Sequence, residues 1–142
     1  MYVILGGAHN GKRKYADRLI SQLPAKELVV CEGHLPKVEN INEDDRYIIS
    51  NFEQLILPYL HEPEEKAAQH IFEKMLQIEE RAELFCICTD TSRGVVPLEK
   101  EARQLRDTCG RLYQKLCNEA QTVIRVWYGI PQILKGDSHG QN

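Results

Sequence analysis

A glycine-rich segment that ends in lysine lies close to the N-terminus, and it constrains the fold more than any other feature of the chain. It follows the apolar run Tyr2–Leu5 and precedes an amphipathic helical pattern over Lys12–Leu23. Its spacing is G-x-x-x-x-G-K, and its residues are Gly6, Gly7, Ala8, His9, Asn10, Gly11 and Lys12. Glycines let a backbone wrap closely around an anion, and the N–H groups that open a helix point toward it. The sequence therefore predicts a strand–loop–helix unit that binds nucleotide phosphates, with Lys12 as the cation.

The residue after this lysine departs from the usual motif. A Ser or Thr normally stands there and binds Mg²⁺ through its hydroxyl, whereas this chain has Arg13. Arg13 is either a solvated residue of the first helical turn or a further contact to the phosphates. The expected cofactor is ATP or GTP. Mg²⁺ can accompany it, but its usual ligands are missing.

Apolar runs alternate with helical patterns along the rest of the chain. The expected strands are Tyr2–Leu5, Glu27–Cys31, Arg46–Ser50, Glu83–Thr89 and Thr122–Tyr128, and the expected helices are Lys12–Leu23, Glu64–Ala82 and Leu98–Ala120. Near-continuous apolar runs suit parallel strands that are buried on both faces. The alternation predicts a three-layer α/β fold in one domain over residues 1–135. We expect Gly33–Asp45 to be a loop and residues 136–142 to be a disordered tail.

Composition narrows the class of protein and its partners. The net charge of −3 argues against a nonspecific nucleic-acid binder. No apolar run approaches the ~20 residues of a membrane span. The five cysteines form no C-x-x-C pair, so we expect buried thiols in a reduced, cytoplasmic protein. A zinc site built from Cys86, Cys88 and a histidine is the alternative.

Three further segments carry a family resemblance together with the glycine loop. They are Gly94–Pro97, the helical stretch Arg103–Leu116 with the sequence RQLRDTCGRLYQKL, and Val126–Ile130. They resemble the Gly-Ile-Val-Pro turn, the helix signature R-x-F-R-D-x-x-G-R-x-N-Q-x-L and the last strand of one family. That family is the bifunctional adenosylcobinamide kinase / adenosylcobinamide-phosphate guanylyltransferase of cobalamin nucleotide-loop assembly. The resemblance covers about the first 25 residues and the stretch from Cys88 to Lys135, and it is poor from Cys31 to Ala82.

The resemblance implies both a fold and a function. The implied fold is that of a P-loop NTPase with a RecA-like, mostly parallel sheet of about five or six strands, assembled as a homotrimer. The implied enzyme binds a purine nucleotide, phosphorylates the aminopropanol hydroxyl of adenosylcobinamide and transfers GMP from GTP through a guanylyl-histidine. Four residues of the signature helix are then candidates for contact with substrate or with a neighbouring subunit: Arg103, Arg106, Asp107 and Arg111. A ladder of i, i+4 ion pairs is the alternative explanation for the spacing of Arg103, Asp107 and Arg111.

The chain also departs from the family pattern at positions that matter for catalysis. The third strand ends in Ser50 instead of a Walker B carboxylate, and the acidic residue before the Gly-Ile-Val-Pro turn is Asp90. Asp90 is either a metal or base residue or a turn-capping carboxylate. The helix that bears the guanylylated histidine is replaced by Gly33–Asp45, where His34 is either a guanylyl acceptor or an ordinary loop residue.

These departures lead to two hypotheses about function. The first is a shortened, divergent family member with reduced kinase activity and without guanylyl transfer. The second is a nucleotide-sensing or partner-binding protein on the same scaffold. With Arg13 and Ser50 at the ligand positions, we expect nucleotide affinity to depend only weakly on Mg²⁺.

Overall fold

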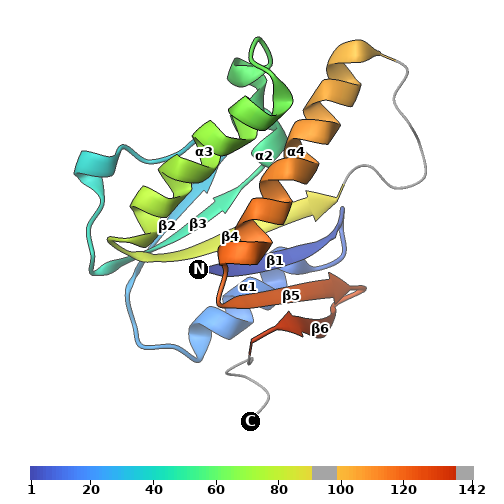
Figure 1. Ribbon diagram of the computed structural model, residues 1–142. Coiled ribbons are helices and arrows are strands. Elements are labelled where there is room, and N and C mark those ends of the chain that lie inside the picture. Colours follow the sequence, from blue (N-terminus) through green and yellow to red (C-terminus); the bar gives the residue numbers. More distant parts are fainter. Residues whose placement is uncertain (91–98, 137–142) are drawn as a thin grey trace.

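The computed structural model describes residues 1–90 and 99–136, which form one six-stranded sheet with helices on both faces (Figure 1). In chain order the elements are β1 (Tyr2–Gly7), α1 (Lys12–Ser21), β2 (Glu27–Glu32), η1 (Val38–Asn40), β3 (Asp45–Ser50), α2 (Phe52–Ile56), η2 (Leu57–Tyr59), α3 (Glu64–Glu79), β4 (Glu83–Asp90), α4 (Lys100–Glu119), β5 (Thr122–Trp127) and β6 (Ile130–Lys135), where η marks a 3-10 helix. The strand order is β2-β3-β4-β1-β5-β6. Strands β1 to β5 are parallel, and β6 runs antiparallel to β5. The predicted three-layer α/β fold of the P-loop NTPase type is confirmed.

Helices α2, α3 and α4 cover one face of the sheet (Figure 1). Their buried side chains, among them Phe52, Ile71 and Leu112, pack in one cluster with Ile49 and Cys86 of the central strands. Each of these side chains is almost fully removed from water. Burial of such large apolar side chains is the main favourable contribution to folding here, at about 1.5–3 kcal/mol for each fully buried one.

Helix α1 covers the opposite face. Its residues Tyr15, Ala16 and Leu19 pack against Ile48 and Phe85. Successive residues of a strand point to opposite faces, which explains why Ile48 belongs to this cluster and Ile49 to the other. The near-continuous apolar runs therefore did indicate strands that are buried on both sides.

Besides the two 3-10 turns, the structure contains a strand and a helix that the sequence patterns did not indicate. Strand β6 follows a tight turn in which Tyr128 has φ 50° and Gly129 has φ 76°, and it pairs along β5. Helix α2 is only five residues long, and its N-cap Asn51 accepts a hydrogen bond from the N–H of Gln54. A helix this short shows no periodicity, and an edge strand that contains Pro131 resembles a loop in sequence.

The connection between β2 and β3 contains only the 3-10 turn η1, so the predicted loop over Gly33–Asp45 is correct up to Asp45, where β3 begins. The Gly94–Pro97 turn and the tail from residue 137 lie outside the described residues. Within the described residues, no helix has both the length and the apolar character needed to cross a membrane.

Candidate functional site

The glycine loop leaves β1 at Gly7 and enters α1 at Lys12, as the sequence predicts. Gly11 has φ 85°, a left-handed conformation that suits glycine, and its carbonyl accepts the hydrogen bond from the Tyr15 N–H that opens the helix. His9 is also left-handed, at φ 61°. The Asn10 carbonyl accepts a hydrogen bond of 2.9 Å from the Gly129 N–H, so the turn between β5 and β6 supports the loop.

Close packing explains the first glycine of the motif. A Cβ atom at Gly6 would lie 2.6 Å from the carbonyl oxygen of Val126, which is a backbone atom that cannot move aside easily. A Cβ atom at Gly7 would meet only the side chain of Asn10, at 3.0 Å. The backbone of β1 and β5 therefore requires glycine at position 6, independently of any ligand.

Lys12 is buried at the mouth of this loop. Its residue is 7% exposed, and its Nζ donates a hydrogen bond of 2.6 Å to the Gly7 carbonyl. Burial lowers the pKa of the Lys12 ammonium below its usual value because the charged form loses hydration. A phosphate bound at the N-terminus of α1 would compensate this ammonium for its lost hydration, because it supplies an oppositely charged hydrogen-bond partner.

A cleft of ≈ 290 Å³ lies beside the loop. It is lined by His9, Gly11, Lys12, Arg13, Lys14, Glu32, Ser50, Ile87 and Thr89. Glu32, Ser50 and Thr89 come from the carboxyl ends of β2, β3 and β4, which is the edge where ligands bind in open parallel sheets. Glu32 was not among the residues predicted for this site, although it is a polar residue at the end of an apolar run.

The alternation of side chains along the strands shows which way these three residues point. Their preceding neighbours pack among α2, α3 and α4, and these neighbours are Cys31, Ile49 and Cys88. Because successive residues point to opposite faces, Glu32, Ser50 and Thr89 point toward the face of α1. Lys12 begins that helix, so the three oxygen-bearing side chains and the buried ammonium share one side of the sheet.

Arg13 is held by its own helix. Its Nε lies 2.9 Å from Oδ1 of Asp17, one turn further along α1, and both side chains are about half exposed. This pairing favours the interpretation of Arg13 as a solvated residue of the first turn. Its backbone still contributes to the helix N-terminus, and the residue lines the cleft.

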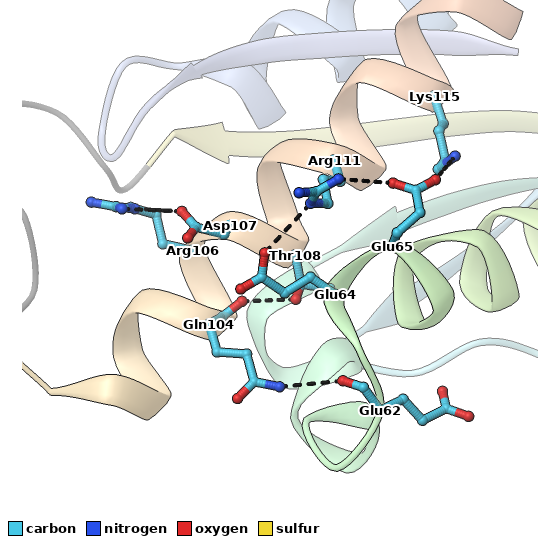
Figure 2. Close-up of polar contacts among 9 residues, drawn as sticks. All are labelled: Glu62, Glu64, Glu65, Gln104, Arg106, Asp107, Thr108, Arg111 and Lys115. Atoms are coloured by element: carbon cyan, nitrogen blue, oxygen red, sulfur yellow. Dashed lines mark hydrogen bonds and ion pairs between the residues drawn. The ribbon is translucent and has the colours of Figure 1, made fainter.

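The signature helix α4 forms its ion pairs mainly with α3 (Figure 2). Arg111 approaches both Glu64, at 3.4 Å, and Glu65, at 3.1 Å, and Lys115 also pairs with Glu65. Arg106 pairs with its neighbour Asp107 at 3.0 Å. Among the described residues, neither Arg103 nor Arg111 pairs with Asp107, so the proposed i, i+4 ladder is wrong and the charges of Arg111 serve the contact between two helices.

Helix α4 also borders a second and larger cleft. It has a volume of ≈ 730 Å³ and lies between the start of α3 and the first half of α4, where Arg103, Gln104, Asp107 and Arg111 contribute to its wall. The Gln104 amide donates to the carbonyls of Leu60 and Glu62, which fixes the segment before α3 against α4. None of the residues that line the cleft at the glycine loop lines this one.

A comparison with protein families decides the relationship. The model of the family described as cobinamide kinase / cobinamide phosphate guanyltransferase matches residues 27–134. The chain belongs to this family. No match was found among curated proteins. The match includes the stretch from Cys31 to Ala82, where the sequence resemblance looked poor. It begins after the glycine loop, so only the geometry of the loop itself supports a phosphate site there.

Two residues that the cobinamide kinase family pattern singled out lie apart from the cleft lining. Asp90 is the last residue of β4 and the register partner of Gly7. It lies two residues after Cys88, so it points to the same face of the sheet as Cys88 and away from α1. His34 is exposed, and its Nδ1 lies 3.2 Å from the Glu32 carbonyl. The structure thus brings Lys12, Ser50 and Thr89 together, with Asp90 beside the loop and His34 on the outer connection.

The sequence predicts buried thiols for this family member, and four of the five cysteines are buried. Cys31, Cys86, Cys88 and Cys109 are buried and Cys117 is partly exposed. Burial raises the pKa of the Cys109 thiol to about 12, which makes it unreactive at neutral pH. In residues 1–90 and 99–136, no group of three or more His, Cys, Asp or Glu side chains is arranged to hold a metal, so the zinc alternative at Cys86 and Cys88 finds no support there.

Proposed function

We propose that this family member binds the phosphates of ATP or GTP at the glycine loop and retains a reduced cobinamide kinase activity. The observation that carries the proposal is Lys12, a buried ammonium at the first residue of α1 beside a cleft at the carboxyl edge of the sheet. In the proposed reaction the bond from the γ-phosphorus to its bridging oxygen breaks, the substrate hydroxyl oxygen bonds to the γ-phosphorus and releases its proton to solvent, and ADP or GDP leaves. Lys12 and the N–H groups of α1 neutralise charge on the phosphates.

The second family activity is proposed to be lost. Guanylyl transfer needs a nucleophilic histidine in line with the α-phosphorus. The β2–β3 connection, where the family pattern places that histidine on a helix, holds only a 3-10 turn, and the exposed His34 there does not line the cleft. No other residue is proposed to replace it.

A non-catalytic role is the second candidate. It is favoured by the residues at positions 13 and 50, where a P-loop kinase has a hydroxyl and a carboxylate that support the metal ion. Here Arg13 pairs with Asp17, and Ser50 ends β3. In that case the chain would bind nucleotide and report its presence to a partner.

We further propose that the cleft between α3 and α4 contacts adenosylcobinamide or a neighbouring subunit through Arg103, Arg106, Asp107 and Arg111. Arg103, Asp107 and Arg111 line this cleft, whereas Arg106 lines a second pocket that shares Asp107 and Arg111 with it. These charged walls suit polar groups of either partner. The assembly expected from the family is a cytoplasmic homotrimer. Light scattering after size exclusion should then give three times the chain mass of 16.4 kDa, and a mass of one chain would contradict it.

Product formation separates the two candidate functions. The protein is incubated with adenosylcobinamide and ATP or GTP, and the corrinoid is analysed by chromatography and mass spectrometry. A slow gain of one phosphate that Lys12→Ala abolishes and Lys26→Ala does not is expected for the kinase. Nucleotide binding without any phosphorylated corrinoid would favour the sensor.

A further inference from the structure

The end of β2 carries a carboxylate next to the position where one is missing. Glu32 is the last residue of β2, and its register partner is Ser50, the last residue of β3. Both residues line the cleft beside Lys12. At position 50 the sequence pattern leads us to expect a Walker B carboxylate. The acidic side chain that is absent there is thus present one strand away.

The direction of Glu32 agrees with such a role. It points to the α1 face, as Ser50 and Thr89 do, because Cys31, Ile49 and Cys88 occupy the opposite face. The left-handed Gly33, at φ 76°, follows it directly and donates its N–H to the Ser50 carbonyl at 2.8 Å. This bond ties the backbone after Glu32 to the end of β3. In the described part of the chain, no ion pair engages the Glu32 carboxylate.

The donor atoms in the cleft fit a magnesium ion that arrives with a nucleotide. Mg²⁺ prefers oxygen ligands and in kinases is commonly held by one or two carboxylates together with substrate phosphates and water. The cleft offers the carboxylate of Glu32 and the hydroxyls of Ser50 and Thr89. A protein cage of several acidic residues is not needed for this mode of binding.

From this arrangement we infer that Glu32 is the metal-binding carboxylate of this chain and holds the Mg²⁺ of a bound nucleoside triphosphate. The inference rests on the proposed nucleotide site. Arg13 and Ser50 alone would predict that nucleotide affinity depends only weakly on Mg²⁺. With Glu32 as a metal ligand, we expect a clear dependence on Mg²⁺ instead. It also gives Glu32 two opposite effects, since an uncompensated carboxylate repels the phosphates when the metal is removed.

Calorimetric titration with ATP and GTP, each with Mg²⁺ and with EDTA, tests the inference on the whole chain. In wild type, Mg²⁺ should strengthen binding by on the order of tenfold to a hundredfold, as for an interaction between charged groups. Glu32→Gln should remove most of this gain and bind metal-free nucleotide more tightly than wild type. Glu27→Gln changes the exposed glutamate at the other end of β2 and should behave as wild type.

A second variant moves the carboxylate without changing the composition. The double substitution Glu32→Ser with Ser50→Glu places it on the register partner and should keep a dependence on Mg²⁺. A Mg²⁺ gain that survives in Glu32→Gln would overturn the inference, and so would nucleotide binding by wild type without any Mg²⁺ gain. Absence of nucleotide binding in every condition would instead overturn the proposed nucleotide site, and the inference with it.

Discussion

At the scale of single residues, Lys12 combines a functional advantage with a structural cost. The ammonium is buried, and its pKa is lowered because it has lost hydration, so the nucleotide-free fold disfavours the charge that a phosphate site needs. The motif spacing predicts a phosphate-binding role for this lysine, and that role is still a proposal. The sequence could not predict its burial or its bond to Gly7, because both depend on how α1 packs against the sheet.

Lys12→Met should therefore leave the nucleotide-free protein at least as stable as wild type. The sign follows from the lowered pKa. Between that pKa and the usual 10.5, the unfolded chain binds more protons than the folded one, so the stability of wild type rises with pH across this window. Urea unfolding at several alkaline pH values should show this rise in wild type and its loss in Lys12→Met. A rise of the same size in the variant would contradict the assignment to Lys12.

A pair of glycines tests two different backbone requirements. Gly6→Ala forces a Cβ atom to within 2.6 Å of the Val126 carbonyl oxygen and should destabilise the fold by about 1–3 kcal/mol, as other overpacked sites do. Gly110 lies in α4 with no atom within 4 Å of a Cβ placed there. Gly110→Ala should therefore stabilise the fold by about 0.5–1 kcal/mol. Urea unfolding of both variants checks the signs, and equal effects would contradict the packing described for β1 and β5.

At the scale of elements, prediction succeeded where a pattern was long and failed where it was short. Helices α1, α3 and α4 and the five parallel strands all follow from periodicity, because each buries a continuous stripe or run. Helix α2 has five residues and β6 is an edge strand with Pro131, so neither leaves a clear signal. One of the two explanations for the charge spacing on α4 was a ladder of pairs within the helix, but Arg111 pairs with α3. The packing of the two helices decides which of these charges meet.

At the scale of the whole molecule, strand order decides which residues share the cleft. Glu32 and Lys12 are brought together by a sheet in which β2, β3 and β4 lie side by side with β1. The sequence indicates that each strand ends in a polar residue, but it does not give the register that pairs Glu32 with Ser50. For this reason the loop could be predicted from sequence and the carboxylate opposite it could not.

The shortened β2–β3 connection gives a prediction about the second family activity. After incubation with GTP, intact-protein mass spectrometry should detect no covalent GMP, because that connection carries only the exposed His34 outside the cleft. The assay should include acid treatment, to which a phosphoramidate bond is labile. An acid-labile GMP adduct that His34→Ala abolishes would restore the bifunctional assignment.

Nucleotide binding through Lys12 is the central claim, and calorimetry of Lys12→Ala tests it most directly. ATP and GTP are titrated into wild type, Lys12→Ala and the control Lys26→Ala, whose exposed lysine lies outside the cleft. Loss of the buried cation should weaken binding of at least one nucleotide by about 1–3 kcal/mol, the range for charge-assisted contacts, while Lys26→Ala binds as wild type does. Equal affinity of wild type and Lys12→Ala for both nucleotides would contradict the phosphate site.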